Sequence, residues 1–399
     1  MCLHSSRGGH YLYANQGGTA DYDICPCKRI GVFLFQKLNF ISKTKMKMEE
    51  KVMKKSIAIL MTVLMMVFSA TGCGQSGAAK NADTASETKT TSEAGAAKEA
   101  DKKEAAKQLN IGIVQIVEHP SLDTIRQSLI KELEAEGFKD GESIKIDYQN
   151  AQGDQSNLNS ICKKFVGDKV DLIVAIATPS AQAAAAATTD IPIIFSAVTD
   201  PVAAKLVDDL NKPAGNVTGT SDAIPVDQVF ELCKALTPNV KTFGFLYTAS
   251  EVNSKSVVDQ AKSLTDKYGF KYEEVTITNT SELQQAASSL AGKVDAIYTP
   301  IDNSIASAMP VLAEVGKQTG KPIYVGADSM VKDGGYATVG VNYEDLGVKT
   351  AEMIAKVLKG TKISEMPVVT LTDFQKVINK TTAAKIGAPA EAEGAIIVE

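Results

Sequence analysis

Residues 170–187 have the sequence VDLIVAIATPSAQAAAAA. The apolar run 170–176 predicts a buried strand, and the alanine-rich run 181–187 predicts a helix that begins at Thr178-Pro179-Ser180. A buried strand that leads directly into a helix is the first part of a βαβ unit. This stretch therefore predicts an α/β fold in which helices cover a parallel sheet.

The same alternation continues through most of the chain from Leu109 onward. Further strands are predicted at 111–117, 144–148, 191–195, 243–247, 272–277, 294–298 and 322–325. Further helices are predicted at 122–133, 158–166, 257–268, 283–290 and 305–315. Two short sequences recur at nearly the same offset: VDLI at 170–173 returns as VDAI at 294–297, and IPI at 191–193 returns as KPI at 321–323. The recurrence indicates two lobes of the same topology.

The composition excludes several classes of function. The chain has 399 residues, a net charge of −5 and only three histidines, His4, His10 and His119. A negative charge argues against a nucleic-acid surface, and so few histidines disfavour a zinc site or a His-dependent triad. The sequence contains no phosphate-binding loop, nucleophile elbow or HExxH motif, so we expect no catalytic residue, metal or cofactor. Cys162 and Cys233 are predicted to be core residues, and a disulfide between them is left open.

A signal sequence is predicted near the N-terminus. Residues 57–68, IAILMTVLMMVF, lie between two lysines and a run of small residues that ends in Gly72-Cys73. This pattern is typical of secretion, and the run is shorter than the about 20 residues of a spanning helix. It resembles the bacterial lipoprotein signal, which implies that residues 53–73 form the signal peptide and that Cys73 is lipidated. Plain secretion with cleavage near Ala70 is the alternative.

The segments on either side of the signal have no pattern of a folded domain. We interpret residues 1–52 as upstream sequence read as protein, with the true start at Met53. Residues 74–108 consist mainly of Ala, Lys, Glu, Ser and Thr, and they contain too few large apolar side chains to form a core. We therefore predict that 74–108 is a disordered linker, with a lone helix over 96–108 as the alternative.

Several motifs at predicted strand ends carry a resemblance to a known family. They are Glu118-His119-Pro120, NAQGD at 150–154, ATPSAQ at 177–182, SAVTDP at 196–201, GTSD at 219–222, and the segment 340–360 with its closing Lys359-Gly360. Together they resemble the substrate-binding lipoproteins of ABC importers, in the branch associated with aromatic amino acids. The resemblance covers nearly all of 109–388.

The resemblance implies the type I periplasmic-binding-protein fold. This fold has two Rossmann-like lobes with parallel sheets, joined by a hinge that the chain crosses three times. We expect lobe 1 to comprise 109–220 plus 342–371, including a helix over Tyr343–Leu358, and lobe 2 to comprise 221–341 plus 372–399. The crossings are expected at 218–222, 341–342 and 371–373.

The implied function is that of an extracytoplasmic receptor, anchored to the cell membrane by lipidated Cys73. It would capture an aromatic amino acid of the tryptophan or phenylalanine type between closing lobes, deliver it to ABC permease subunits, and act as a monomer without nucleic acid. The alternatives are a sensory co-receptor with a signalling partner, or a receptor for a branched-chain amino acid, nucleoside or short peptide. An extracytoplasmic enzyme would need a nucleophile–base or metal constellation, which the sequence does not offer.

Ligands of open parallel sheets bind beyond the carboxyl ends of the strands, so the loops after the strands are the candidate site. In the loop after the predicted strand 170–176, we expect Thr178, Ser180 and the amide of Ala181 to hold a ligand carboxylate at a helix N-terminus. An ordinary N-cap is the alternative. Ser196 and Thr199 either share the carboxylate or cap the following turn.

A ligand ammonium needs a carboxylate partner. Asp328 is the first candidate, because amino-acid binders of this fold carry an acid near that position, and Asp302 and Glu118 follow. For each, the alternative is a helix cap or a solvated loop acid.

Four further residues are expected at the cleft. Thr299 and Asn303 would face it from lobe 2, together with Tyr247, which either stacks on an aromatic ligand or packs in the core. His119 either edges the cleft or has a structural role before Pro120.

Overall fold

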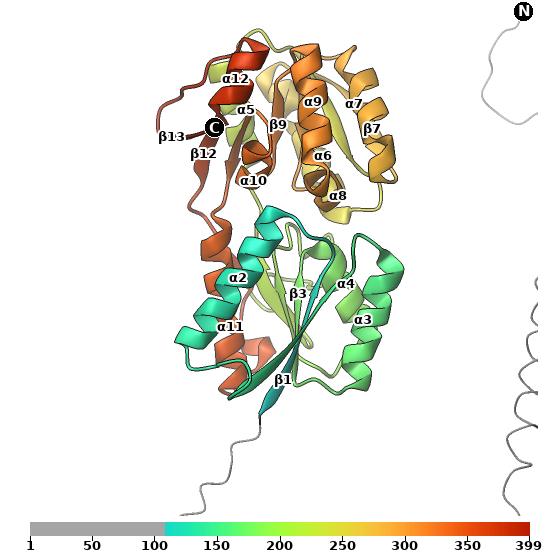
Figure 1. The fold of residues 1–399 in the computed structure, drawn as a ribbon, viewed down its shortest axis with the longest axis vertical. Coiled ribbons are helices and arrows are strands. Elements are labelled where there is room, and N and C mark those ends of the chain that lie inside the picture. Colours follow the sequence, from blue (N-terminus) through green and yellow to red (C-terminus); the bar gives the residue numbers. More distant parts are fainter. Residues whose placement is uncertain (1–107) are drawn as a thin grey trace, which may run out of the picture. The chain divides into compact units, whose positions relative to one another are not determined.

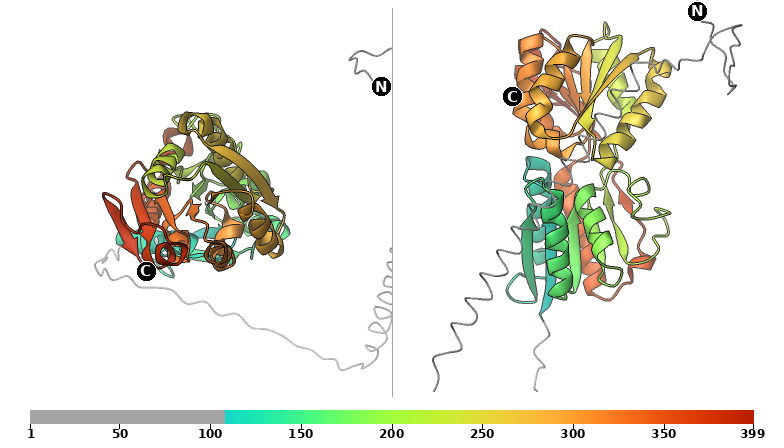
Figure 2. Two further views of the ribbon diagram at one scale, coloured as in Figure 1. Left: turned by 90° about the horizontal axis from the view of Figure 1, so that it is seen from above. Right: turned by 90° about the vertical axis from the view of Figure 1, so that its right-hand side faces the viewer.

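The computed structural model describes residues 108–399. The predicted extension 1–52, the signal peptide 53–73 with Cys73, and all of the predicted linker except Gln108 lie outside the described residues. Within them, the two α/β lobes expected from the sequence are confirmed as two sheets, each covered by helices on both faces (Figures 1 and 2).

The first sheet has six strands in the order β11-β5-β4-β3-β1-β2, all paired in parallel. Its strands are β1 (Leu109–Gln115), β2 (Ile144–Asn150), β3 (Leu172–Ile176), β4 (Ile193–Ser196), β5 (Val217–Ser221) and β11 (Val369–Thr370). Two helix pairs cover it: α2 (Pro120–Ala135) packs against α11 (Tyr343–Leu358), and α3 (Gln155–Gly167) packs against α4 (Thr178–Ala187) (Figure 1).

The second sheet has seven strands in the order β13-β12-β10-β9-β8-β6-β7, in which only the β10–β12 pair is antiparallel. Its strands are β6 (Thr242–Thr248), β7 (Lys271–Ile277), β8 (Ala296–Thr299), β9 (Ile323–Val325), β10 (Ala337–Gly340), β12 (Gln375–Asn379) and β13 (Ala395–Val398). Its main helix pairs are α5 (Val226–Leu236) with α6 (Val252–Tyr268), and α7 (Leu283–Ala291) with α9 (Met309–Thr319). The shorter helices are α8 (Asn303–Ser307), α10 (Asp328–Lys332) and α12 (Lys380–Ile386).

The chain passes between the two sheets three times. It leaves the first sheet after β5, returns to it through α11 after β10, and leaves it again between β11 and β12. Because these passages follow the carboxyl ends of strands, they lie on the same edge as the loops that carry the candidate site.

One predicted helix is wrong. The sequence predicted a single helix over 305–315, but the structure has two helices, α8 and α9, separated at Ala308 with φ −117° and ψ 20°. Pro310 is the cause, because a proline has no N–H and its ring clashes with the preceding turn of a helix. It is tolerated here because it lies in the first turn of α9.

The two lobes have differently composed cores. The first lobe is filled mainly by Ile, Leu, Val and Ala, whereas the second combines such residues with a group of packed rings that includes Phe230, Phe243 and Phe270. Cys162 belongs to one core and Cys233 to the other, and both are buried and unpaired, which confirms their prediction as core residues. Burial raises the pKa of each thiol to about 11, so both stay protonated.

A substitution at Gly219 in β5 can test how tightly the first sheet is packed. A Cβ at this position would lie 2.0 Å from the backbone oxygen of Phe195. Since a backbone oxygen cannot move away cheaply, we expect Gly219→Ala to lower the free energy of unfolding by about 2–3 kcal/mol in urea denaturation. Gly167→Ala is the control, because nothing lies within 4 Å of its Cβ position. A Gly219→Ala protein as stable as that control would contradict the packing described here.

Candidate ligand-binding site

The loops at the carboxyl ends of the two sheets contact each other. His119 Nε2 lies 3.4 Å from Asn303 Oδ1, and the hydroxyls of Ser121 and Ser329 are 2.5 Å apart. A third contact joins the lobes, since Ser256 Oγ donates to Asp200 Oδ2 at 2.5 Å. These hydrogen bonds place side chains of both lobes in one polar interface, which includes His119 and Asn303 of the predicted site residues.

Thr178 and Ser180 contribute two buried hydroxyls at the start of α4. Neither Thr178 Oγ1 nor Ser180 Oγ has a hydrogen-bond partner among the described residues, although both side chains are at most 1% exposed. The predicted third donor is already used, because the Ala181 amide donates to the carbonyl of Ala177 at 3.1 Å. Two unpartnered hydroxyls at a helix N-terminus are suited to bind an anionic group.

The backbone before this helix is strained. Ala177 has φ 77° and ψ 157°, a region that residues other than glycine rarely adopt. Such a conformation costs about 1–3 kcal/mol and is found mainly at functional loops. The strain therefore agrees with a binding role for the Thr178-Pro179-Ser180 turn.

Ser196 and Thr199 have partners within the protein. Ser196 Oγ lies 2.8 Å from Thr350 Oγ1 and 3.3 Å from Thr220 Oγ1, so it joins β4, β5 and α11. Thr199 Oγ1 donates to Asp222 Oδ1 at 2.8 Å. Ser196 thus links three elements of the first lobe, and Thr199 fixes the orientation of the Asp222 carboxylate.

That acid, Asp222, is a candidate that sequence reasoning missed. It is fully buried directly after β5, and its other oxygen accepts from the Tyr343 hydroxyl at 3.3 Å. Burial raises the pKa of Asp222 to about 6, against the opposing effect of the hydrogen bonds from Thr199 and Tyr343. None of the ion pairs formed by residues 108–399 involves Asp222. Its place at the end of the GTSD motif, beyond a strand, was the signal that could have found it.

Asp302 is the N-cap of α8. Its carboxylate accepts from the amide of Thr248 at 2.7 Å, the hydroxyl of Thr248 at 2.8 Å, the hydroxyl of Ser254 at 2.8 Å and the amide of Ile305 at 3.0 Å. These four hydrogen bonds occupy the oxygens that a ligand ammonium would need. The carboxylate therefore joins the loop after β6 to the loop after β8.

Glu251 is a second residue that sequence reasoning missed. Its carboxylate accepts from Asn303 N at 2.9 Å and Asn303 Nδ2 at 2.7 Å, and from the amide and hydroxyl of Ser304, both at 2.9 Å. Burial and the neighbouring charge of Asp302 raise the pKa of Glu251. Glu251 fixes the orientation of Asn303, whose remaining side-chain atom, Oδ1, faces His119.

His119 reaches across from the first lobe. The side chain is 6% exposed, its Nε2 faces Asn303, and its Nδ1 has no partner among the described residues. Burial lowers the pKa of His119 to about 4, against the effects of Asn303 and of the Asp123 charge, so the ring is neutral at physiological pH.

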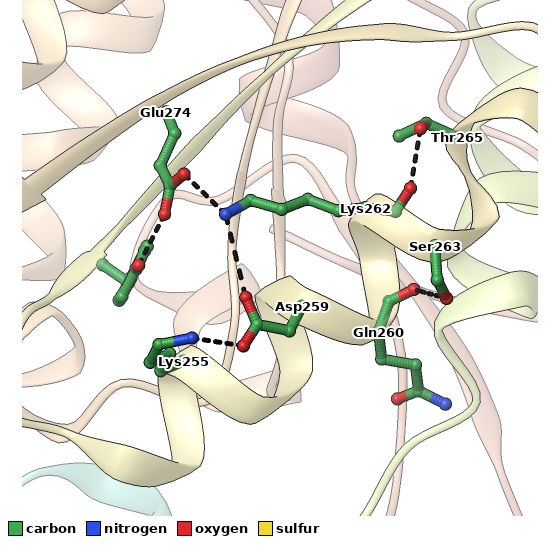
Figure 3. Close-up of polar contacts among 8 residues, drawn as sticks. Lys255, Asp259, Gln260, Lys262, Ser263, Thr265 and Glu274 are labelled. Carbon is green, nitrogen blue, oxygen red and sulfur yellow. Dashed lines mark hydrogen bonds and ion pairs between the residues drawn. The ribbon is translucent and has the colours of Figure 1, made fainter. Parts of the chain in front are cut away.

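Thr299 and Tyr247 differ in their surroundings. Thr299 Oγ1 is completely buried and has no partner in the described part of the chain. The Tyr247 hydroxyl donates to Glu274 Oε1 at 2.5 Å, and its ring belongs to the core of the second lobe. Glu274 also accepts from Lys262, which in turn faces Asp259 (Figure 3). Thr299 is therefore free to bind a ligand, whereas the Tyr247 hydroxyl belongs to this network.

The remaining two predicted acids are more exposed. Asp328 forms an ion pair with Lys332 at 2.6 Å and lines a cavity of about 280 Å³ together with Ser121, Asn342 and Tyr343. Glu118 is exposed. Across residues 108–399 no cluster of side chains could hold a metal ion, and no helix there is long and apolar enough to span a bilayer.

The role of Asp302 can be tested by truncation. Asp302→Ala leaves the buried donors of Thr248, Ser254 and Ile305 without an acceptor, so we expect a loss of about 2–4 kcal/mol in the free energy of unfolding. Asp259→Asn is the control, because the exposed Asp259 carboxylate pairs with Lys255 and Lys262 at the surface, and its loss should cost less than about 1 kcal/mol (Figure 3). Equal losses in the two variants would contradict the anchoring role of Asp302.

Known proteins resemble the whole folded part of the chain. A curated tyrosine-binding protein of Clostridioides difficile is 45% identical over 329 residues, which are 82% of this chain and 91% of that protein. The crystal structure of an ABC domain from Streptococcus pneumoniae in complex with L-Trp is 44% identical, with a TM-score of 0.71, and covers 73% of this chain and 100% of its own.

A second solved structure differs from the Trp-bound one in its ligand state. It is the ligand-free, open form of a substrate-binding protein with adhesive properties from Clostridium difficile, with 48% identity and coverage of 73% of this chain and 99% of its own. Its TM-score is 0.58, so this chain superposes better on the Trp-bound relative, at similar identity and coverage, than on the open one. The solved neighbours have the type I periplasmic-binding-protein fold, as the sequence predicted.

The model of one family, the ABC transporter substrate-binding proteins, matches residues 110–393. The chain therefore belongs to this family of substrate-binding proteins.

Proposed function

We propose that the protein binds an aromatic amino acid between its two lobes for uptake by an ABC importer. The observation that carries the proposal is the set of buried, unpartnered hydroxyls of Thr178 and Ser180 in lobe 1 and Thr299 in lobe 2. Hydroxyl groups of this kind suit the carboxylate of an amino acid, since hydrogen bonds to a charged group are the stronger ones. The relatives that bind tyrosine or are solved with L-Trp support the aromatic class.

In the proposed site, Asp222 takes the ligand ammonium. It is the buried carboxylate at the first chain crossing, and its side-chain partners among the described residues are the hydroxyls of Thr199 and Tyr343. Asp302 offers no free oxygen, Glu118 is exposed, and Asp328 has Lys332 as its partner. A cation next to Asp222 would offset the desolvation of its charge.

Binding would favour the closed arrangement of the lobes. A ligand shifts an equilibrium between conformations toward the one in which it makes more contacts, and the proposed site has groups on both lobes. The closed lobes would then dock on the permease. We further propose an extracytoplasmic location, a lipid anchor at Cys73 after cleavage of the signal peptide just before this residue, and a monomeric receptor.

Fluorescence provides a direct test of ligand binding, because the chain contains no tryptophan. Excitation selective for indole therefore reports only on added L-Trp. We expect a saturable blue shift of the emission when the protein is titrated, with competition by L-Tyr. No change at high micromolar L-Trp, and no thermal stabilisation by any aromatic amino acid, would contradict the proposed function.

The role of the first-lobe hydroxyls is tested by Thr178→Val and Ser180→Ala. Each variant removes one hydrogen bond to a charged group, which corresponds to about 10- to 100-fold weaker binding in the same titration. Thr189→Val, at an exposed position just beyond the other end of α4, is the control and should bind as the parent does. Parent-like affinity of the Thr178 and Ser180 variants would place the carboxylate elsewhere.

The proposed partner of the ammonium predicts a pH dependence. Burial raises the pKa of Asp222 to about 6 in the free protein, and the ammonium requires the ionised form. As the pH falls below about 6, a proton must leave Asp222 before the ligand binds, so affinity should decrease by up to about 10-fold per pH unit. Asp222→Asn should bind more weakly and lose this dependence. An unchanged pH profile in Asp222→Asn would exclude Asp222 as the partner.

A further inference from the structure

The geometry points to His119 as the residue that selects ligands by a side-chain hydrogen-bond donor. We propose that its Nδ1 accepts a hydrogen bond from the N–H or O–H of the ligand ring, so that the site prefers tryptophan and tyrosine to phenylalanine. This inference rests on the proposed function and deepens it, because it names the chemical feature of the aromatic ring that the cleft recognises.

The first step is the orientation of the Asn303 amide. Its Nδ2 donates to Glu251 Oε2 at 2.7 Å, and its backbone amide donates to the same oxygen at 2.9 Å. Glu251 also accepts from Ser304, so its carboxylate acts only as an acceptor in this network. The NH₂ group of Asn303 must therefore point to Glu251, and its carbonyl oxygen must point to His119.

The second step is the tautomer of His119. Asn303 Oδ1 is an acceptor 3.4 Å from Nε2, so Nε2 must carry the proton in this contact. Because the buried ring is neutral, its single proton is then on Nε2 and Nδ1 carries a lone pair. Nδ1 is thus a hydrogen-bond acceptor whose state is set by the chain from Glu251 through Asn303.

The third step is that this acceptor is buried without a donor. Nδ1 has no partner among residues 108–399, and the His119 side chain is 6% exposed. The hydroxyls of Thr178, Ser180 and Thr299 are also unpartnered, so none of them serves Nδ1. A buried acceptor that lacks a donor is unfavourable, and a ligand N–H or O–H would satisfy it.

The fourth step is that the ring is held in place. His119 is the extended residue before α2, with φ −157° and ψ 160°, and Pro120 follows as the first helical residue. The carbonyl of His119 accepts from the amide of Asp123 at 3.1 Å. The ring therefore extends from a fixed backbone after the first strand and contacts the other lobe. A ring held in this way cannot move to suit different ligands, so it can distinguish a ligand that offers a donor from one that does not.

Isothermal titration of the full chain with L-Trp, L-Tyr and L-Phe tests the inference. We expect L-Trp and L-Tyr to bind about 10-fold or more tightly than L-Phe. His119→Gln and His119→Asn form a matched pair, because the glutamine amide replaces the Nε2 position and the asparagine amide replaces the Nδ1 position. His119→Gln should weaken L-Trp and L-Tyr by about 10-fold more than L-Phe, whereas His119→Asn should keep part of the preference.

The outcomes separate this inference from the proposed function. Equal affinity of the parent protein for all three amino acids would overturn the inference but leave the proposed function intact. Equal weakening of all three ligands in His119→Gln would also overturn it, because His119 would then contact the ligand ammonium or support closure. Failure of all three amino acids to bind the parent protein would instead remove the proposed function.

Discussion

Two buried carboxylates organise the edge of the second lobe that contacts the first lobe. Glu251 and Asp302 lie in the loops after β6 and β8, and together they accept nearly every donor that these loops offer. Burying two acids close together is unfavourable unless their oxygens are fully hydrogen-bonded, and here they are. The orientation of Asn303 and, through it, the proposed tautomer of His119 depend on these hydrogen bonds.

The sequence was sufficient for the fold because the apolar periodicity and the strand ends are local signals. The helix start at Thr178 was predicted in this way, from a Thr-Pro-Ser turn between a buried strand and an alanine-rich run, and the same turn supplies the two hydroxyls of the proposed site. The split between α8 and α9 follows from Pro310, which a helical periodicity alone does not reveal. The same local rule could have flagged Asp222, which follows β5 directly.

The roles of the acids depend on tertiary contacts and therefore could not be ranked from the sequence. Asp302, Glu251 and Asp222 all follow strands, and nothing local distinguishes them. The Asp302 carboxylate is occupied because Ser254 and Thr248 donate hydrogen bonds to it in addition to its helix-cap bond. The side-chain partners of Asp222 are two hydroxyls, those of Thr199 and Tyr343. Tyr247 likewise could stack on a ligand or pack in the core, and the position of Glu274 on the neighbouring strand decides where its hydroxyl points.

In the proposed site, closure and ligand binding would be coupled through the same unsatisfied atoms. In the arrangement described here, three hydrogen bonds join the lobes, each worth about 0.5–1.5 kcal/mol. Against them stand the hydroxyls of Thr178, Ser180 and Thr299 and the Nδ1 of His119, each of which costs about 1–3 kcal/mol when it is buried without a partner. Three such bonds contribute about 1.5–4.5 kcal/mol and four such atoms cost about 4–12 kcal/mol, so the opposing sum is the larger and lobe–lobe contacts alone do not favour closure. A ligand that satisfies these four atoms removes the opposing sum and leaves the favourable one, which makes the closed state a consequence of binding rather than of the protein alone.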